Sequence, residues 1–118
     1  MKYRLVEVDD LAAGEVRPVE AGSLGLLIIK TLSGEVRALR DRCPHQGARL
    51  SRGYVLRQIV AKSDDGGYAL NDDEIVLQCP WHGMEFKAAT GVCPADETYR
   101  VAPVKVTIED GCVVMERR

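Results

Sequence analysis

The chain has 118 residues, of which 46% are hydrophobic and 29% are charged, proportions typical of one folded globular domain rather than a disordered tail. Sixteen basic and eighteen acidic residues give a net charge of −2, so we expect no nucleic-acid partner held by bulk positive charge. The longest apolar run, residues 24–29, is far shorter than the roughly 20 residues of a membrane span, so we expect no membrane association.

Apolar and polar residues alternate along the first part of the chain, which predicts strands. We expect a strand at 3–8, turns at 9–15, and strands at 24–32 and 35–40 joined by a tight hairpin turn at Ser33-Gly34. The short extended piece 16–20 contains Pro18, which has no backbone donor and therefore favours the edge of a sheet.

The second part of the chain follows the same period. Residues 54–62 are β-branched and apolar, and turn residues follow at 63–67 and, as an acidic run, at 71–74, before a strand at 75–78. We expect the acidic turns only to keep this segment solvated. Strands at 104–109 and 112–116 flank Asp110-Gly111, a pair that suits a type I′ hairpin turn. With no sustained helical stripe, the fold class is all-β: a small antiparallel sandwich or barrel.

Two short segments carry the chemistry of the sequence: Cys43-Pro44-His45-Gln46-Gly47 and Cys79-Pro80-Trp81-His82-Gly83. They contain the chain's only two histidines, and each places a proline directly after its cysteine and a glycine soon after its histidine. Proline fixes φ and glycine permits conformations closed to other residues, so both segments are expected to form stiff turns. Two equivalent loops would then each present one thiolate and one imidazole to a shared centre.

This doubled motif resembles the Rieske iron–sulfur family. The resemblance implies one [2Fe–2S] cluster per chain, in which two histidines replace two cysteines on one iron. Cys43 and Cys79 would bind the buried iron, and His45 and His82 the outer iron at the protein surface. It also implies a single domain over residues 1–118, with a cluster-binding subdomain inserted at about residues 41–91.

Other uses of the cysteines remain open. A structural zinc site also binds two cysteines and two histidines, although its loops usually pair cysteine with cysteine and histidine with histidine. A thiol–disulfide centre would need a second cysteine in place of His82. Outside the motif, we expect Cys112 to be a small core residue and Cys93 to be a partly exposed thiol. The first residues carry no signal-peptide pattern, so the chain is expected to be cytoplasmic, where disulfides are rare.

Within the family, the resemblance indicates a low-potential protein. High-potential members have an extra cysteine in each loop, where this chain has Ala48 and Trp81, so their disulfide between the loops is not possible here. They also supply a serine and a tyrosine that donate hydrogen bonds to the cluster sulfurs, at places that Met84 and Phe86 occupy here. Fewer donors leave more negative charge on the cluster, which lowers its potential.

The chain shows no further catalytic centre. Both histidines are assigned to the cluster, so none remains for the mononuclear iron of an oxygenase, and no nucleotide fingerprint is present. We therefore expect an electron-transfer component rather than a stand-alone catalyst: a one-electron carrier between a reductase and a terminal oxygenase or other oxidoreductase. The alternatives are a small accessory subunit of a larger reductase, of the nitrite-reductase type, and a structural zinc module.

Overall fold

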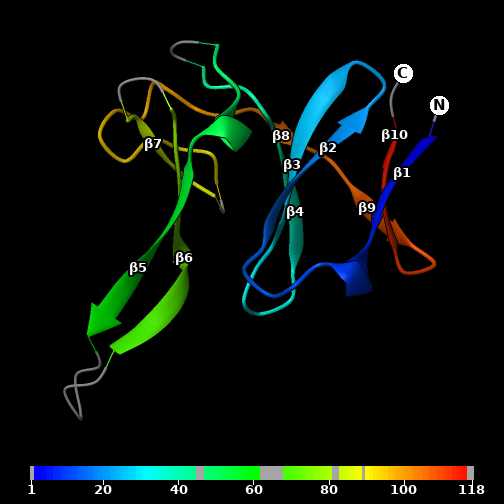
Figure 1. Ribbon diagram of the computed structural model, residues 1–118, viewed down its shortest axis with the longest axis horizontal. Coiled ribbons are helices and arrows are strands. Elements are labelled where there is room, and N and C mark those ends of the chain that lie inside the picture. Colours follow the sequence, from blue (N-terminus) through cyan, green and yellow to red (C-terminus); the bar gives the residue numbers. More distant parts are fainter. Residues whose placement is uncertain (1, 45–46, 62–67, 81–82, 89, 117–118) are drawn as a thin grey trace.

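The computed structural model of the chain describes residues 2–44, 47–61, 68–80, 83–88 and 90–116; for 56–61 and 68–74 it describes the backbone alone. These residues form antiparallel strands and two three-residue 3₁₀ turns, η1 (Val8–Asp10) and η2 (Leu50–Arg52), and contain no α-helix (Figure 1). The all-β prediction is confirmed. No helix within the described ranges is long and apolar enough to cross a membrane.

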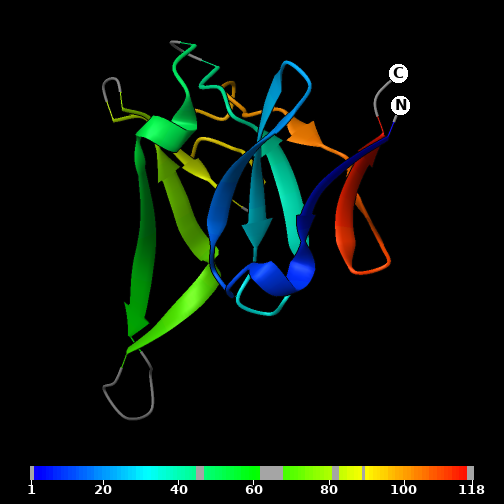
Figure 2. The same cartoon turned by 45° about the vertical axis from the view of Figure 1, so that its right-hand side comes forward.

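The described strands make three antiparallel sheets. In spatial order, the terminal sheet holds β1 (Lys2–Glu7), β10 (Cys112–Glu116) and β9 (Thr107–Glu109). The central sheet holds β2 (Val16–Ala21), β3 (Leu24–Lys30), β4 (Val36–Arg40) and β8 (Pro103–Val104). The inserted sheet holds β5 (Tyr54–Ala61), β6 (Tyr68–Gln78) and β7 (Glu85–Lys87). Both ends of the described chain lie side by side, because β1 pairs with β10 (Figures 1 and 2).

Strand β3 is buried on both faces, which explains the uninterrupted apolar run in its sequence. Leu27 and Ile29 point into the core shared with the inserted sheet, whereas Leu26 and Ile28 point into the cores shared with the terminal sheet. Its neighbour β2 is an edge strand, and Pro18 within it confirms the edge prediction.

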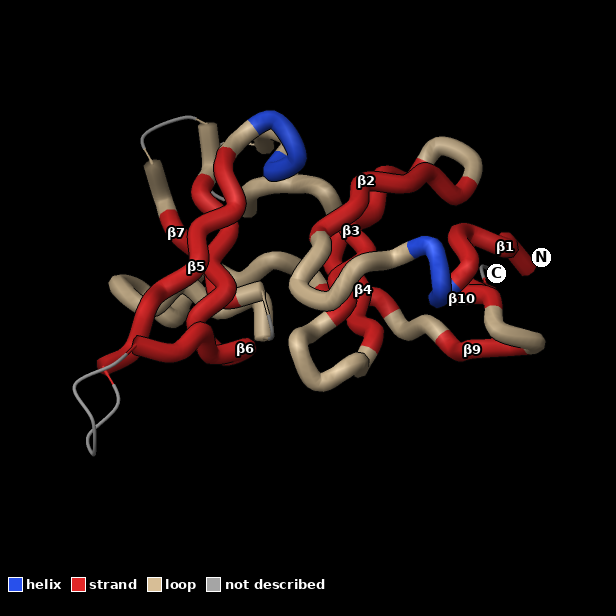
Figure 3. Tube along the Cα trace, turned by 60° about the horizontal axis from the view of Figure 1, so that its bottom comes forward, coloured by secondary structure: helices blue, strands red, loops and turns tan. Residues whose placement is uncertain are grey.

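The inserted sheet interrupts the central sheet in sequence but not in space. Strand β4 pairs directly with β8, although about sixty residues separate them in the chain, and those residues build β5, β6 and β7. Figure 3 shows this sheet beside the central one, with the β5–β6 hairpin pointing away. The expectation of an inserted subdomain is confirmed, whereas its boundaries at 41–91 remain a prediction.

Three local predictions need correction. Residues 71–74 are not a turn: they continue β6 as a bulge opposite Gln58, because Arg57 pairs with Ile75 and Ile59 with Leu70. The β3–β4 turn is wider than a two-residue turn, since Thr31 N–H donates to the Glu35 carbonyl at 2.8 Å. The expected strand 104–109 is split between β8 and β9, which belong to different sheets. The predicted turn at 63–67 lies outside the described residues.

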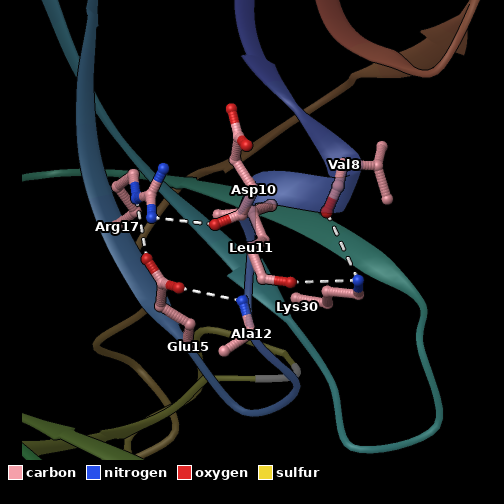
Figure 4. Close-up of polar contacts among 7 residues, drawn as sticks. All are labelled: Val8, Asp10, Leu11, Ala12, Glu15, Arg17 and Lys30. Carbon is pink, nitrogen blue, oxygen red and sulfur yellow. Dashed lines mark hydrogen bonds and ion pairs between the residues drawn. The ribbon is translucent and has the colours of Figure 1, made fainter.

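Two connections follow the predicted local rules. Asp110 and Gly111 have φ of 51° and 77°, the positive values that a type I′ turn between β9 and β10 requires. The predicted turns between β1 and β2 are held by side chains (Figure 4): Glu15 accepts hydrogen bonds from Ala12 N–H and Arg17, and Lys30 donates to the carbonyls of Val8 and Leu11. These donors hold the pKa of the Glu15 carboxyl below its ordinary value of 4.5, with the Ala12 N–H contributing most.

Candidate metal centre

The two motif segments share a backbone hydrogen bond and a glycine conformation in their described residues. In the first, Cys43 N–H donates to the Ala48 carbonyl at 2.8 Å, and in the second, Cys79 N–H donates to the Met84 carbonyl at 2.8 Å. In each, the fifth residue is a left-handed glycine, with φ of 75° at Gly47 and 67° at Gly83. We call these segments loop 1 (43–48) and loop 2 (79–84). The predicted equivalence of the two turns is confirmed in their described residues.

Both loop cysteines point into the protein. Cys43 and Cys79 are 0% and 1% exposed, and they share one hydrophobic core with residues of β3, β6 and β7. None of the four cysteines forms a disulfide. The other predicted ligands, His45 and His82, lie outside the described residues, as does Trp81. The complete ligand set Cys43, His45, Cys79 and His82 therefore remains a prediction, of which the structure describes the two thiols.

The donor chemistry of the two thiols fits an iron–sulfur centre. Cysteine binds iron as the thiolate, and a thiolate buried without a positive partner is costly. A metal centre supplies that partner, so two fully buried thiols at the start of matching loops suit soft metal ions. The exposed prolines Pro44 and Pro80 follow the cysteines and carry no backbone donor that would need a partner.

The η2 turn and Gly53 contact the residues that precede both loops, and the sequence did not predict these contacts. We call them the brace. Asp41, 6% exposed and two residues before Cys43, accepts the Ser51 N–H at 2.8 Å and the Ser51 hydroxyl at 2.6 Å. Ser51 lies in η2, which ends at Gly53. Gly53 lies so close to the residue before Cys79 that a Cβ on it would overlap the Gln78 carbonyl oxygen. The η2 turn is thus fixed to both loops, and the sequence offered no local pattern for contacts between such distant residues.

The two remaining cysteines are both structural in position. Cys112 is 4% exposed in β10, as predicted. Cys93 was expected to be partly exposed, and this is wrong: its side chain is 2% exposed in the same core as the loop cysteines. The reason is a short pairing that turns the side chain inward, in which Cys93 N–H donates to the Tyr99 carbonyl at 3.1 Å beside the Val92–Arg100 bridge.

Loop 2 has an apolar side, which faces the core, and polar neighbours elsewhere. Phe86 is fully buried beneath the loop, and Met84 packs against the same core. Gln78 lies across the loop, with its amide nitrogen 3.5 Å from the Gly83 carbonyl oxygen. A hollow of about 370 Å³ beside Met84 and Cys93 ends at Asp96, whose pKa is lowered because the hydroxyl and N–H of Thr98 donate to its carboxylate.

Comparison with known proteins identifies the family. The family model described as the Rieske [2Fe-2S] domain matches residues 1–106. The chain belongs to the Rieske family. Its cofactor is accordingly a [2Fe–2S] cluster, and the recognition of this family from the doubled loop motif is confirmed.

Individual relatives differ in how much of their length the chain covers. It is 37% identical over 84 residues to apoptosis-inducing factor 3 of Mus musculus, which is 71% of this chain and 11% of that protein. The chain thus spans about a tenth of the first curated relatives it matches. It is 27% identical over 106 residues to the 3-phenylpropionate/cinnamic acid dioxygenase ferredoxin subunit of Shigella boydii, covering 87% of this chain and 83% of that subunit.

Solved structures support the same fold. The Sphingomonas yanoikuyae B1 ferredoxin superposes with a TM-score of 0.69 and 28% identity, and the match covers 100% of both chains. A putative nitrite reductase small subunit superposes with a TM-score of 0.68 over 99% of both chains. Its identity of 22% shows the shared fold alone.

Proposed function

We propose that this chain is a one-electron carrier that receives an electron from a reductase and delivers it to a terminal oxygenase or another oxidoreductase. The observation that carries the proposal is the pair of fully buried thiols, Cys43 and Cys79, at the start of two loops with matching backbone geometry. The similarity to dioxygenase ferredoxin subunits over most of both chains supports the class of partner.

In this proposal Cys43, His45, Cys79 and His82 hold the cluster, which lies in a cluster-binding part of about residues 41–91. The bound cluster supplies a site that takes up one electron. The chain's own residues exclude water from the thiolates, through the core around Phe86, and fix the spacing of the loops through the Asp41–Ser51 brace. The proposed location is the cytoplasm, where disulfides are rare; none of the four cysteines forms one.

The test is the visible and electron paramagnetic resonance spectra of freshly purified protein, combined with iron and sulfide analysis and a reductive titration. We expect about two irons and two sulfides per chain and uptake of one electron, with the spectrum of a centre that has mixed histidine and cysteine ligands. Colourless protein with stoichiometric zinc would instead establish the structural zinc module.

A second candidate is a small accessory subunit of a larger reductase. The fold shared with the putative nitrite reductase small subunit over nearly the whole of both chains favours it. Native purification separates the two candidates: a free carrier elutes alone, whereas an accessory subunit elutes in a stable complex with its large subunit.

A further inference from the structure

A positively charged surface lies directly beside loop 1. Arg40, Arg42 and Arg49 are all exposed and line one shallow hollow of about 190 Å³. The other lining residues are Ser23 between β2 and β3, Gly25 in β3, Asp41 before loop 1 and Gly47 within it. We call this surface the arginine hollow. Its charge is opposite to the net charge of −2 of the whole chain.

The single carboxylate in the lining, that of Asp41, offsets one of the three positive charges of the arginines and leaves the lining with an excess of positive charge. Asp41 is buried, and both of its oxygens accept hydrogen bonds from Ser51 on the inner side of the loop. Among the ion pairs between described residues, Arg49 pairs with Glu20 at 3.1 Å, and Arg40 and Arg42 take part in none. The Arg49–Glu20 pair is about half exposed on both sides, so it is weak and open to exchange with another carboxylate.

The arginine hollow is also coupled to the loop by contact. The guanidinium of Arg42 lies over Gly47, where its Nη2 is 3.5 Å from the position that a Cβ would take. Arg49 reaches the start of β3, where its Nη1 is 3.7 Å from the position that a Cβ would take at Gly25. The planar guanidinium groups suit bidentate binding of carboxylates. A partner docked here would therefore lie against the backbone of loop 1.

We propose that the arginine hollow is the docking surface for an acidic patch on the protein that exchanges electrons with this chain. This proposal rests on the proposed function, because it assigns the docking surface of the same electron carrier. Charge complementarity selects the occupant: three exposed guanidinium groups on a chain of negative net charge favour carboxylates of a partner and reject a basic protein.

The first experiment measures the binding of an acidic polymer to the arginine hollow and involves no electron transfer. Fluorescent poly-L-glutamate, a substitute for an acidic protein surface, is titrated with the full chain as purified, at low salt, and binding is followed by fluorescence anisotropy. We expect binding that the double substitution Arg40→Glu and Arg42→Glu weakens about tenfold or more, since each site changes by two charges. The matched control carries Arg4→Glu and Lys105→Glu, which change the net charge equally on exposed positions of β1 and of the segment before β9. Equal weakening in both variants would overturn the proposal.

The second experiment asks whether the arginine hollow lies on the route of the electron. Reduced protein is mixed with ferricyanide, which takes one electron and becomes ferrocyanide, while the cluster absorbance reports reoxidation. Wild-type protein should react about tenfold more slowly at high than at low ionic strength, because an anion is attracted locally despite the net negative charge. In the Arg40/Arg42 variant the rate of reoxidation should instead rise with ionic strength. In the control variant the rate should fall with ionic strength, as in the wild type. A rate that rises with salt in the wild type refutes the proposal even if the variant does not fold.

A third experiment distinguishes a docking surface for a protein from a binding site for small anions. Inorganic phosphate is added at constant ionic strength. Saturable inhibition by phosphate in the micromolar range would show an anion pocket and overturn the docking proposal, whereas no specific inhibition supports it. If the chain holds no cluster, the proposed function fails, yet the poly-L-glutamate titration still decides the surface.

Discussion

At the scale of single residues, the sequence predicts which cysteines can bind a metal better than it predicts how exposed each side chain is. Cys43 and Cys79 were recognised because each occurs in a short pattern with proline, histidine and glycine, and they prove to be the starts of two matching loops. Cys93 has no such pattern, and its burial depends on pairing with Tyr99 and on the sheet above it. Local patterns report what a residue can bind, whereas its exposure is set by distant segments.

Replacing Cys43 or Cys79 by alanine should abolish the cluster and lower thermal stability, because metal binding and folding are coupled. The measurement is iron content and the visible spectrum, with the unfolding midpoint followed by circular dichroism. Cys112→Ala is the matched control, since it removes a buried thiol from β10 and should leave the cluster spectrum unchanged. A complete [2Fe–2S] spectrum in either loop variant would contradict the ligand assignment.

At the scale of elements, strands with alternating residues and the Asp110-Gly111 turn were predicted correctly because their rules are local. The acidic run 71–74 has the composition of a turn, but the pairing of β6 with β5 on either side keeps it within a strand. The η2 turn and its contacts escaped prediction for the opposite reason. Asp41, Ser51 and Gln78 acquire their roles only when the inserted sheet folds back onto loop 1.

The brace at η2 predicts that Gly53→Ala is severely destabilising. The added Cβ would overlap the Gln78 carbonyl oxygen, a backbone atom whose displacement would also move Cys79. We expect a loss of about 3 kcal/mol, the upper end of the cost of overpacking, together with weaker retention of iron. Gly25→Ala is the control, since its Cβ would make only ordinary contacts, the nearest at 3.6 Å, to Asp41. Equal unfolding midpoints for the two variants would show that the backbone at Gln78 accommodates the added methyl group without loss of stability.

The connection between β1 and β2 carries a pH-dependent contribution through Glu15. Because hydrogen bonds from Ala12 and Arg17 lower the pKa of Glu15 in the folded state, its contribution is complete above the ordinary value of 4.5. It is lost as pH falls through the lowered folded-state value. Glu15→Gln should therefore narrow the stability difference between about pH 6 and about pH 3 relative to wild type. Unfolding midpoints across this range provide the measurement, and Glu97→Gln, at an exposed site elsewhere, is the control.

At the scale of the whole molecule, the all-β class and the family followed from the sequence, because the doubled loop motif is specific and its residues are close in the chain. The arrangement of three sheets did not follow. It depends on β4 and β8 pairing across the insertion, and on β3 presenting opposite faces to two sheets. The apolar run of β3 indicates burial on both faces, but it does not tell which segments cover them.

The electron affinity of the whole protein provides the last prediction. By the family resemblance, high-potential members carry a disulfide and hydroxyl donors where this chain has Ala48 and Trp81, and Met84 and Phe86. Phe86, in β7, is fully buried. Without O–H donors toward the sulfurs, negative charge on the reduced cluster is less stabilised. The midpoint at neutral pH should accordingly lie in the lower half of the Rieske range of about −150 to +300 mV, as measured by voltammetry.

A single substitution tests the cause of that potential. Phe86→Tyr adds a hydroxyl within the core next to loop 2, and the midpoint should rise where this hydroxyl donates to a sulfur of the cluster or of a cysteine ligand. Tyr3→Phe, on β1 of the terminal sheet, removes a hydroxyl far from loop 2 in the fold and should leave the midpoint unchanged. A wild-type midpoint well above the middle of the range would show that groups other than these side chains set the potential. Since Phe86 packs against the same core as Cys43 and Cys79, the substitution changes the donor set while both thiols keep their places in the loops.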